Sequence, residues 1–193
     1  MDIQTRRRAP EATRAEIIDM AIEAAAEEGA TGLKLDAVVA RLPFSKGALL
    51  HHFPTKQALL EGVVDQLAGE MAAAVLAEAT RDPNPYGRNA RAYLRATVNE
   101  PVTERDVCIG RAILATCAVE PVLIGRWRAA MQALAADDPV DPAGKDDALM
   151  LRLIADGLWM SDLFGTHEVS PEQRRALLSL LTPGSILTDG HGF

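Results

Sequence analysis

The chain has 193 residues, 48% of them hydrophobic, and a net charge of −7. This much apolar surface excludes a disordered chain, because a substantial core can be buried. No run of about 18 or more apolar residues occurs, and the charged start of the chain lacks the apolar stretch of a signal peptide. We therefore expect a cytoplasmic protein with no membrane span, in which Cys108 and Cys117 stay reduced.

The negative charge does not exclude nucleic acid as a partner, because the charge is unevenly distributed. Residues 1–56 hold eight basic and eight acidic side chains, so the whole net charge falls in residues 57–193. The acids of the N-terminal segment cluster before residue 37, and Arg41, Lys46 and Lys56 follow with no acid between them. This leaves a cationic stretch that could meet phosphate groups.

Helical periodicity dominates the chain. Apolar residues repeat at helical spacing in the first segment, and Gly29 ends it where a left-handed residue is needed. Strand signals are nearly absent, and residues 137–142 form the clearest loop. We predict an all-α fold of about nine helices, with the last ten residues as a loose tail. Capping residues and prolines place the later helices at about 35–42, 45–52, 55–79, 84–99, from 103 onward, 120–136, 144–166 and 170–181.

Residues 35–53 hold two short helices joined by a tight turn, which is the form of a helix-turn-helix. In that motif the second helix lies in the major groove of DNA. Small residues let its backbone approach base edges, a lysine can reach a guanine or a phosphate, and hydroxyl or imidazole groups can contact phosphates. The candidates on the second helix are Ser45, Lys46, Gly47, Ala48, His51 and His52.

The segment Ser45–Lys56, with Gln57-Ala58-Leu59-Leu60 after it, resembles the recognition helix and the following helix of the TetR family. The resemblance extends back through Ile17, Ala21 and Gly29 and covers roughly residues 13–62. It implies a homodimeric transcriptional regulator, most often a repressor, that binds double-stranded operator DNA and is released by a small molecule.

The resemblance also implies two functional domains along the chain. Residues 1–56 would form a three-helix DNA-binding head, and residues 57–193 a helical body that binds the effector and dimerises through its last two helices. By position, phosphate contacts fall at Lys34, Ser45, His51 and Lys56, and base contacts at Lys46 and Ala48.

Three features depart from the family pattern. The turn reads Leu42-Pro43-Phe44 where an alanine-glycine-valine run is usual, and proline cannot take the positive φ of a turn glycine. Leu50 stands where tyrosine is frequent, and it cannot hydrogen-bond a phosphate. Lys34 stands where a threonine would cap the second helix. These departures bear on the operator sequence and on individual contacts.

The candidate effector residues are polar, aromatic and sulfur-containing side chains of the body. An apolar cavity with one or two polar groups would suit a small hydrophobic ligand. Arg111 and Asp156 stand inside apolar helices, so they could pair with each other or with a ligand. Ordinary core packing is the alternative for each residue. The set is Tyr93, Cys108, Arg111, Trp127, Met131, Asp156 and Trp159, and Cys117 and Met150 are further candidates.

The helices at about 144–166 and 170–181 carry apolar stripes suited to a dimer face. Gly157, Ser161 and Gly165 recur every four residues and would permit close helix approach. Packing within one chain is the alternative. The stripes comprise Leu149, Leu153, Asp156, Gly157, Met160, Ser161, Phe164 and Gly165, then Leu177, Leu178, Leu180 and Leu181.

Other classes of function lack a signal in the sequence. No Gly-rich phosphate loop, nucleophile elbow or metal-ligand cluster occurs, so we expect no enzyme activity, no cofactor and no metal. A small helical enzyme or a protein-only adaptor that uses the same body is the alternative. At the start of the chain, Arg6-Arg7-Arg8 is either an arm that contacts DNA or a solvated terminus.

Overall fold

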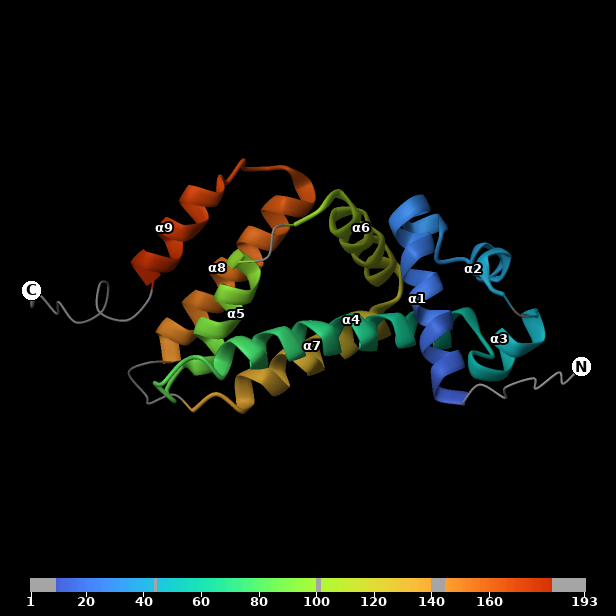
Figure 1. Ribbon diagram of the computed structural model, residues 1–193, viewed down its shortest axis with the longest axis horizontal. Helices are drawn as coiled ribbons and strands as arrows, with labels where there is room; N and C mark the ends of the chain where they lie inside the picture. The colour runs from blue at the N-terminus through green and yellow to red at the C-terminus, as the bar shows by residue number, and fades with distance from the viewer. Residues whose placement is uncertain (1–9, 44, 100–101, 140–144, 182–193) are drawn as a thin grey trace, which may run out of the picture. The chain divides into compact units, whose positions relative to one another are not determined.

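A computed structural model describes residues 10–43, 45–99, 102–139 and 145–181. These ranges form nine α-helices and one 3-10 turn and contain no strand, which confirms the all-α prediction (Figure 1). Arg6-Arg7-Arg8, Phe44 and the predicted tail lie outside the described residues. The elements are α1 (Pro10–Glu28), η1 (Gly29–Thr31), α2 (Leu35–Arg41), α3 (Lys46–His52), α4 (Lys56–Ala79), α5 (Arg88–Asn99), α6 (Glu104–Val119), α7 (Pro121–Ala136), α8 (Lys145–Phe164) and α9 (Pro171–Leu181).

Local capping signals set several helix starts. The Ser45 hydroxyl accepts the backbone N–H three residues further on, at 3.4 Å, before α3. Thr55 does the same for α4, at 3.0 Å. At α9, Ser170 accepts from the amide of Gln173 at 3.3 Å, and the side chain of Gln173 accepts from the amide of Ser170 at 2.8 Å. These three predicted caps are confirmed, and the last is a reciprocal capping box.

Two predicted helix boundaries are wrong, one a start and the other an end, and a glycine with positive φ explains both. The helix expected from Asn84 begins at Arg88, because the preceding Gly87 has a φ of +66° and cannot continue a right-handed helix. The helix expected to reach residue 166 ends at Phe164, because Gly165 has a φ of +62°.

The described helices pack into two compact units, whose boundaries fall within α4, between α5 and α6, and within α7. The first unit holds the chain up to Leu67 together with Glu104–Trp127, and the second holds Ala68–Thr103 and the chain from Arg128 onward. In this division into compact units, α6 therefore belongs with α1–α3. The functional boundary after residue 56 stays a prediction.

The first unit is built around α1 and holds the helix-turn-helix in place. Ile17, Ala21 and Ala25 on α1 have no exposed surface. The same core includes Val38 of α2 and Leu49 of α3, with residues from α4, α6 and the start of α7. Because α2 and α3 each insert a fully buried side chain, their outer surfaces are held in fixed positions.

The second unit is built on the packing of α5 against α8. Leu94 and Val98 of α5 lie in one core cluster with Leu151 and Leu158 of α8. A smaller cluster joins α4, α5 and the end of α7 around Val75. Burial of these side chains, each contributing about 1.5–3 kcal/mol, stabilises the unit.

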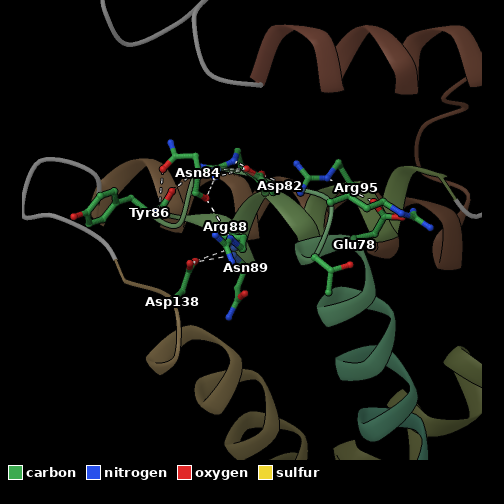
Figure 2. Close-up of polar contacts among 12 residues, drawn as sticks. Glu78, Asp82, Asn84, Tyr86, Arg88, Asn89, Arg95 and Asp138 are labelled. Carbon is green, nitrogen blue, oxygen red and sulfur yellow. Dashed lines mark hydrogen bonds and ion pairs between the residues drawn. The ribbon is translucent and has the colours of Figure 1, made fainter.

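A buried ion pair ties the turn after α4 to α5 (Figure 2). Arg91 donates to both carboxylate oxygens of Asp82, from Nε at 2.8 Å and from Nη2 at 3.1 Å. Its other donors reach the carbonyl oxygens of Tyr86 at 2.7 Å and Asn84 at 2.9 Å. Arg95 donates to Asp82 at 3.1 Å. The hydrogen bond from Arg91 lowers the pKa of Asp82 to about 2, against the opposing effect of burial.

Asp138 connects the segment after α7 to the start of α5 (Figure 2). Its fully buried carboxylate accepts from the amides of Asn89 at 3.0 Å and Ala90 at 2.9 Å. The first turn of a helix leaves such amides without intrahelical partners. Arg152 of α8 donates to the same carboxylate at 2.8 Å. The side chain of Asn89 donates in turn to the carbonyl of Leu134 on α7 at 3.0 Å. One aspartate thereby joins three helices.

Candidate nucleic-acid interface and effector residues

Burial of one side of α3 fixes which side is exposed. Leu49 has no exposed surface, and Phe53 just after the helix is 1% exposed. Both belong to the core of the first unit. The opposite side, which we call the outer face of α3, consists of the exposed residues Lys46, Gly47, Leu50 and His51.

The other predicted DNA-contact residues lie on α3 or near the starts of the neighbouring helices α2 and α4. Ser45 is exposed at the N-cap, whereas Ala48 and His52 are half-buried. The rings of His51 and His52 meet edge to face, with centroids 5.3 Å apart. Lys34 precedes α2 and Lys56 begins α4; both are exposed. Among the described residues no group of three His, Cys, Asp or Glu side chains could hold a metal ion.

The turn between α2 and α3 is made without a left-handed residue at its described positions. Leu42 has φ −76° and ψ 139°, and Ser45 has φ −71° and ψ 156°. Pro43 is compatible with such an extended path because its ring fixes φ near −65°. Leu50, at 39% exposure, places an apolar side chain on the outer face of α3.

Acidic side chains lie beside two of the cations that follow residue 37. Lys46 Nζ lies 3.0 Å from Asp36 Oδ1 at the start of α2, and both side chains are largely exposed. Arg41 pairs with Glu27 at 2.7 Å and Glu28 at 2.6 Å, at the end of α1. The acid-free stretch in the sequence is therefore not free of acids in space. The signal that could have shown this is a lysine at the first position of α3 with an acid ten residues earlier, at the start of α2.

Two predicted effector residues meet in the second unit. The Tyr93 hydroxyl of α5 donates to Asp156 of α8 at 2.7 Å. Burial raises the pKa of Tyr93, and the neighbouring carboxylate raises it further. Trp159 lies one turn beyond Asp156 on α8, and Tyr93 packs against both core clusters of the unit. This part of the unit combines aromatic surface with one carboxylate.

The predicted effector set as a whole does not fall in one unit. Tyr93, Met131, Asp156 and Trp159 belong to the second unit, whereas Cys108, Arg111 and Trp127 belong to the first. Trp127 packs against the core of the first unit, as the core-packing alternative predicts. Among the described residues the side-chain partner of Asp156 is Tyr93, and a ligand contact at Asp156 stays a prediction.

An apolar stripe on α8 is exposed, but it is narrower than predicted. Ser161 does not belong to it, because Ser161 is buried and its hydroxyl accepts from His167 N at 3.1 Å within the chain. Gly165 lies beyond the helix. On α9, Leu177 and Leu178 pack half-buried on their own unit. The exposed residues of the predicted stripe are Leu149 (53%), Leu153 (59%), Asp156, Gly157, Met160 (39%) and Phe164 (57%) on α8, and Leu180 (56%) on α9.

Among the described residues, no single helix is long and apolar enough to cross a membrane. Glu104–Val119 and Pro121–Ala136 reach that length and composition only when taken together, across a bend of 118°.

Comparison with known families gives two matches that cover most of the chain. Residues 17–63 match the family described as bacterial regulatory proteins, tetR family. Residues 87–183 match the tetracyclin repressor-like C-terminal domain. A comparison with curated protein sequences gives no match.

Solved structures resemble the chain over nearly its whole length. The multidrug binding protein EbrR complexed with imidazole is 27% identical, with a TM-score of 0.64, over 93% of this chain and 94% of that one. EbrR complexed with ethidium is 26% identical, with a TM-score of 0.60, over 88% and 97%. A structure from Mesorhizobium loti MAFF303099, named as of a TetR-family transcriptional regulator, shares the fold at 19% identity and a TM-score of 0.64, over 91% and 96%.

Proposed function

Because this chain belongs to the TetR family of bacterial regulatory proteins, we propose that it is a cytoplasmic transcriptional repressor released from its operator by a small molecule. The family fold itself implies DNA-binding transcription regulation with a ligand-binding C-terminal part. The observation that carries the DNA-binding proposal is the outer face of α3, with Lys46 exposed at the first position after the N-cap residue Ser45. Lys34, Ser45, Gly47, Ala48, His51, His52 and Lys56 are the further contacts we propose.

Loss of Lys46 tests this proposal. An operator is first selected with the purified protein from a random-sequence duplex pool, and affinity is then measured by fluorescence anisotropy at several salt concentrations. Lys46→Ala should weaken operator binding by about 1–3 kcal/mol if the lysine reads a base. If the lysine neutralises a phosphate instead, the loss is smaller and the salt slope falls by about 0.9 for each head.

Lys145→Ala is the matched control, since Lys145 is an exposed lysine at the start of α8 in the second unit. Equal affinities for the two variants would remove Lys46 from the interface. A pool that yields no selected sequence would refute DNA recognition and return attention to the enzyme and adaptor alternatives.

We propose that the exposed stripe of α8, with Leu180 of α9, forms the homodimer face. Two heads of one dimer would then sit in successive major grooves, about 34 Å apart. Leu153→Glu would place an unpaired charge in this interface, and we expect the dimer dissociation constant to rise by about 100-fold or more. Sedimentation equilibrium would follow the fall in mass towards the 20.7 kDa monomer.

The matched control for the dimer face is Leu76→Glu, because Leu76 on α4 is exposed to a similar degree, 50%. If both variants stay dimeric, the stripe is not the interface. If Leu76→Glu dissociates as well, the effect is not specific to α8.

We propose that the effector is an aromatic cation that contacts Tyr93 and Asp156. Among the described residues, Asp156 is partnered by a hydroxyl and not by an arginine or lysine, so its charge is available to a cation. Tyrosine and tryptophan faces favour cations as well. The similar protein EbrR was solved with ethidium, itself an aromatic cation. An effector that releases DNA must bind the DNA-free dimer better, typically by about 1–3 kcal/mol.

Asp156→Asn should weaken ethidium binding by about ten-fold or more, measured by fluorescence titration in the absence of DNA. Asp146→Asn removes the same charge from an exposed position at the start of the same helix, and should leave ethidium affinity unchanged. Equal affinities for the two variants would contradict the role of Asp156.

A further inference from the structure

Leu50 is an exposed apolar side chain on the surface expected to face DNA. Among the described residues of α1, α2 and α3, it is the one large hydrophobic side chain that is exposed, at 39%. Its neighbour Leu49 is fully buried in the core of the first unit. The fold therefore uses Leu49 for packing and leaves the outer part of the Leu50 side chain available to a contact outside the chain.

Gly47 lies beside Leu50 on the same face, and the fold does not require a glycine there. Residues three apart on a helix are surface neighbours. The φ of Gly47 is not positive, and among the described residues a β-carbon at this position would meet the Ser45 hydroxyl at an ordinary distance of 3.6 Å. Glycine is disfavoured inside a helix. What it provides at this exposed position is an open helix surface beside Leu50.

We propose that Leu50 and Gly47 form a thymine-reading site, in which the C5-methyl group of one thymine packs on the Leu50 side chain and lies over the Gly47 backbone. The proposal rests on the DNA-binding function proposed above. It names one feature of the operator, a thymine at a fixed position in each half-site. Leu50 is then a specificity-determining residue, beside the polar contacts proposed for Lys46.

The chemistry of the major groove selects this occupant. Thymine alone presents a methyl group on its base edge there. Leu50 has no polar atom, so it can bond neither a phosphate nor a donor or acceptor of a base. Lys46 lies one turn earlier on the same exposed face, and its positive charge favours a polyanion over an apolar protein partner.

The gain is specific because it depends on the base. Packing a methyl group on an aliphatic side chain removes apolar surface of both partners from water. Cytosine and the two purines lack the methyl group, so at this position they give the Leu50 side chain no comparable contact. Leu50 thus stabilises the complex with thymine over complexes with the other bases, and specificity is such a difference between affinities.

Replacement of thymine by deoxyuridine in the selected operator tests the site, since deoxyuridine forms the same base pair and lacks only the methyl group. Each thymine is replaced in turn, at symmetric positions of both half-sites, and affinity is measured by fluorescence anisotropy. At one position we expect wild-type binding to weaken by about four-fold for each half-site, as the burial of one carbon implies. Leu50→Ala should bind the two operators within about two-fold of each other.

Leu76→Ala is the matched control for this variant. Leu76 on α4 is also an exposed leucine, at 50%, and it lies outside the helix-turn-helix. Leu76→Ala should keep the full preference of the wild type for the methyl group.

Gly47→Ala tests the other half of the site through a result that a folding defect cannot produce. Alanine favours a helix, so the melting temperature should be equal or higher. Operator affinity should nevertheless fall by about ten-fold or more, because the added carbon occupies the space of the methyl group. The loss should be smaller on the deoxyuridine operator, where that space is free. Gly125→Ala, at an exposed glycine of α7, should leave operator affinity unchanged.

The proposal is overturned if no position of the operator responds to deoxyuridine in the wild type. It is also overturned if Leu50→Ala keeps the full effect of deoxyuridine, because the methyl group would then act through the DNA itself or through another residue. Unchanged operator affinity in Gly47→Ala would remove Gly47 from the site. Failure of the DNA-binding function itself appears separately, as a wild-type protein that selects no operator.

Discussion

Asp138→Ala is expected to lower the free energy of unfolding of the second unit by about 3–5 kcal/mol. The carboxylate has no exposed surface and accepts three hydrogen bonds, two from amides at the start of α5 and one from Arg152. Alanine leaves these donors without partners, and Arg152 becomes a partly buried charge without its counter-ion. Breaking such a pair from one side costs more than the pair itself contributes.

Asp137→Ala is the control, since Asp137 is the neighbouring residue, carries the same charge and is exposed. Its effect should be below about 0.5 kcal/mol. Because the chain has two compact units, amide hydrogen exchange is the better measurement: protection at Asn89 and Ala90 should be lost first in Asp138→Ala. Similar losses in both variants would contradict the capping role. Protein concentration must be equal, since the dimer proposed above would add to apparent stability.

Gly32→Ala should destabilise the first unit by about 3 kcal/mol or more. A β-carbon at Gly32 would lie 1.8 Å from the carbonyl oxygen of Ala24 and 2.9 Å from the nitrogen of Ala25. Both atoms belong to the backbone of α1, which is fixed by fully buried side chains such as Ile17. No side-chain rotation can relieve this overlap, so η1 or α1 must move.

Gly125→Ala provides the comparison within the same unit. Gly125 lies inside α7, and a β-carbon there would meet nothing within 4 Å. Alanine is favoured over glycine in a helix by about 1 kcal/mol, so this variant should be slightly more stable than wild type. Thermal unfolding measures both variants. Equal melting temperatures would show that the contact at Gly32 is not a constraint.

Local signals in the sequence predicted the helices well, for a physical reason. The hydroxyls of Ser45, Thr55 and Ser170 cap helices through atoms three residues away. A short window of sequence contains both partners of such an interaction. The two wrong helix boundaries, at Asn84 and at residue 166, also have local causes. They arise because Gly87 and Gly165 take positive φ, which a glycine permits but does not require.

The candidate DNA-binding residues were also found locally, because the helix-turn-helix occupies one continuous segment. The acidic side chains that lie near this segment in space were not found from the sequence. Along the chain Arg41 and Lys46 are separated from acids, but η1 and α2 bring Glu27, Glu28 and Asp36 back to them. Electrostatic interaction depends on distance in space, so a count along the chain misjudged the local field.

By itself the sequence determined the all-α class, the order of the helices and the place of the recognition helix. These follow from periodicity and capping, which act over one or two turns. Tertiary structure alone decided which of two adjacent aspartates is buried, and that Tyr93 meets Asp156. It also decided that Ser161 faces inward while Leu153 stays exposed. Each of these depends on the relative placement of helices distant in sequence, which comes from packing a whole core and from no local pattern.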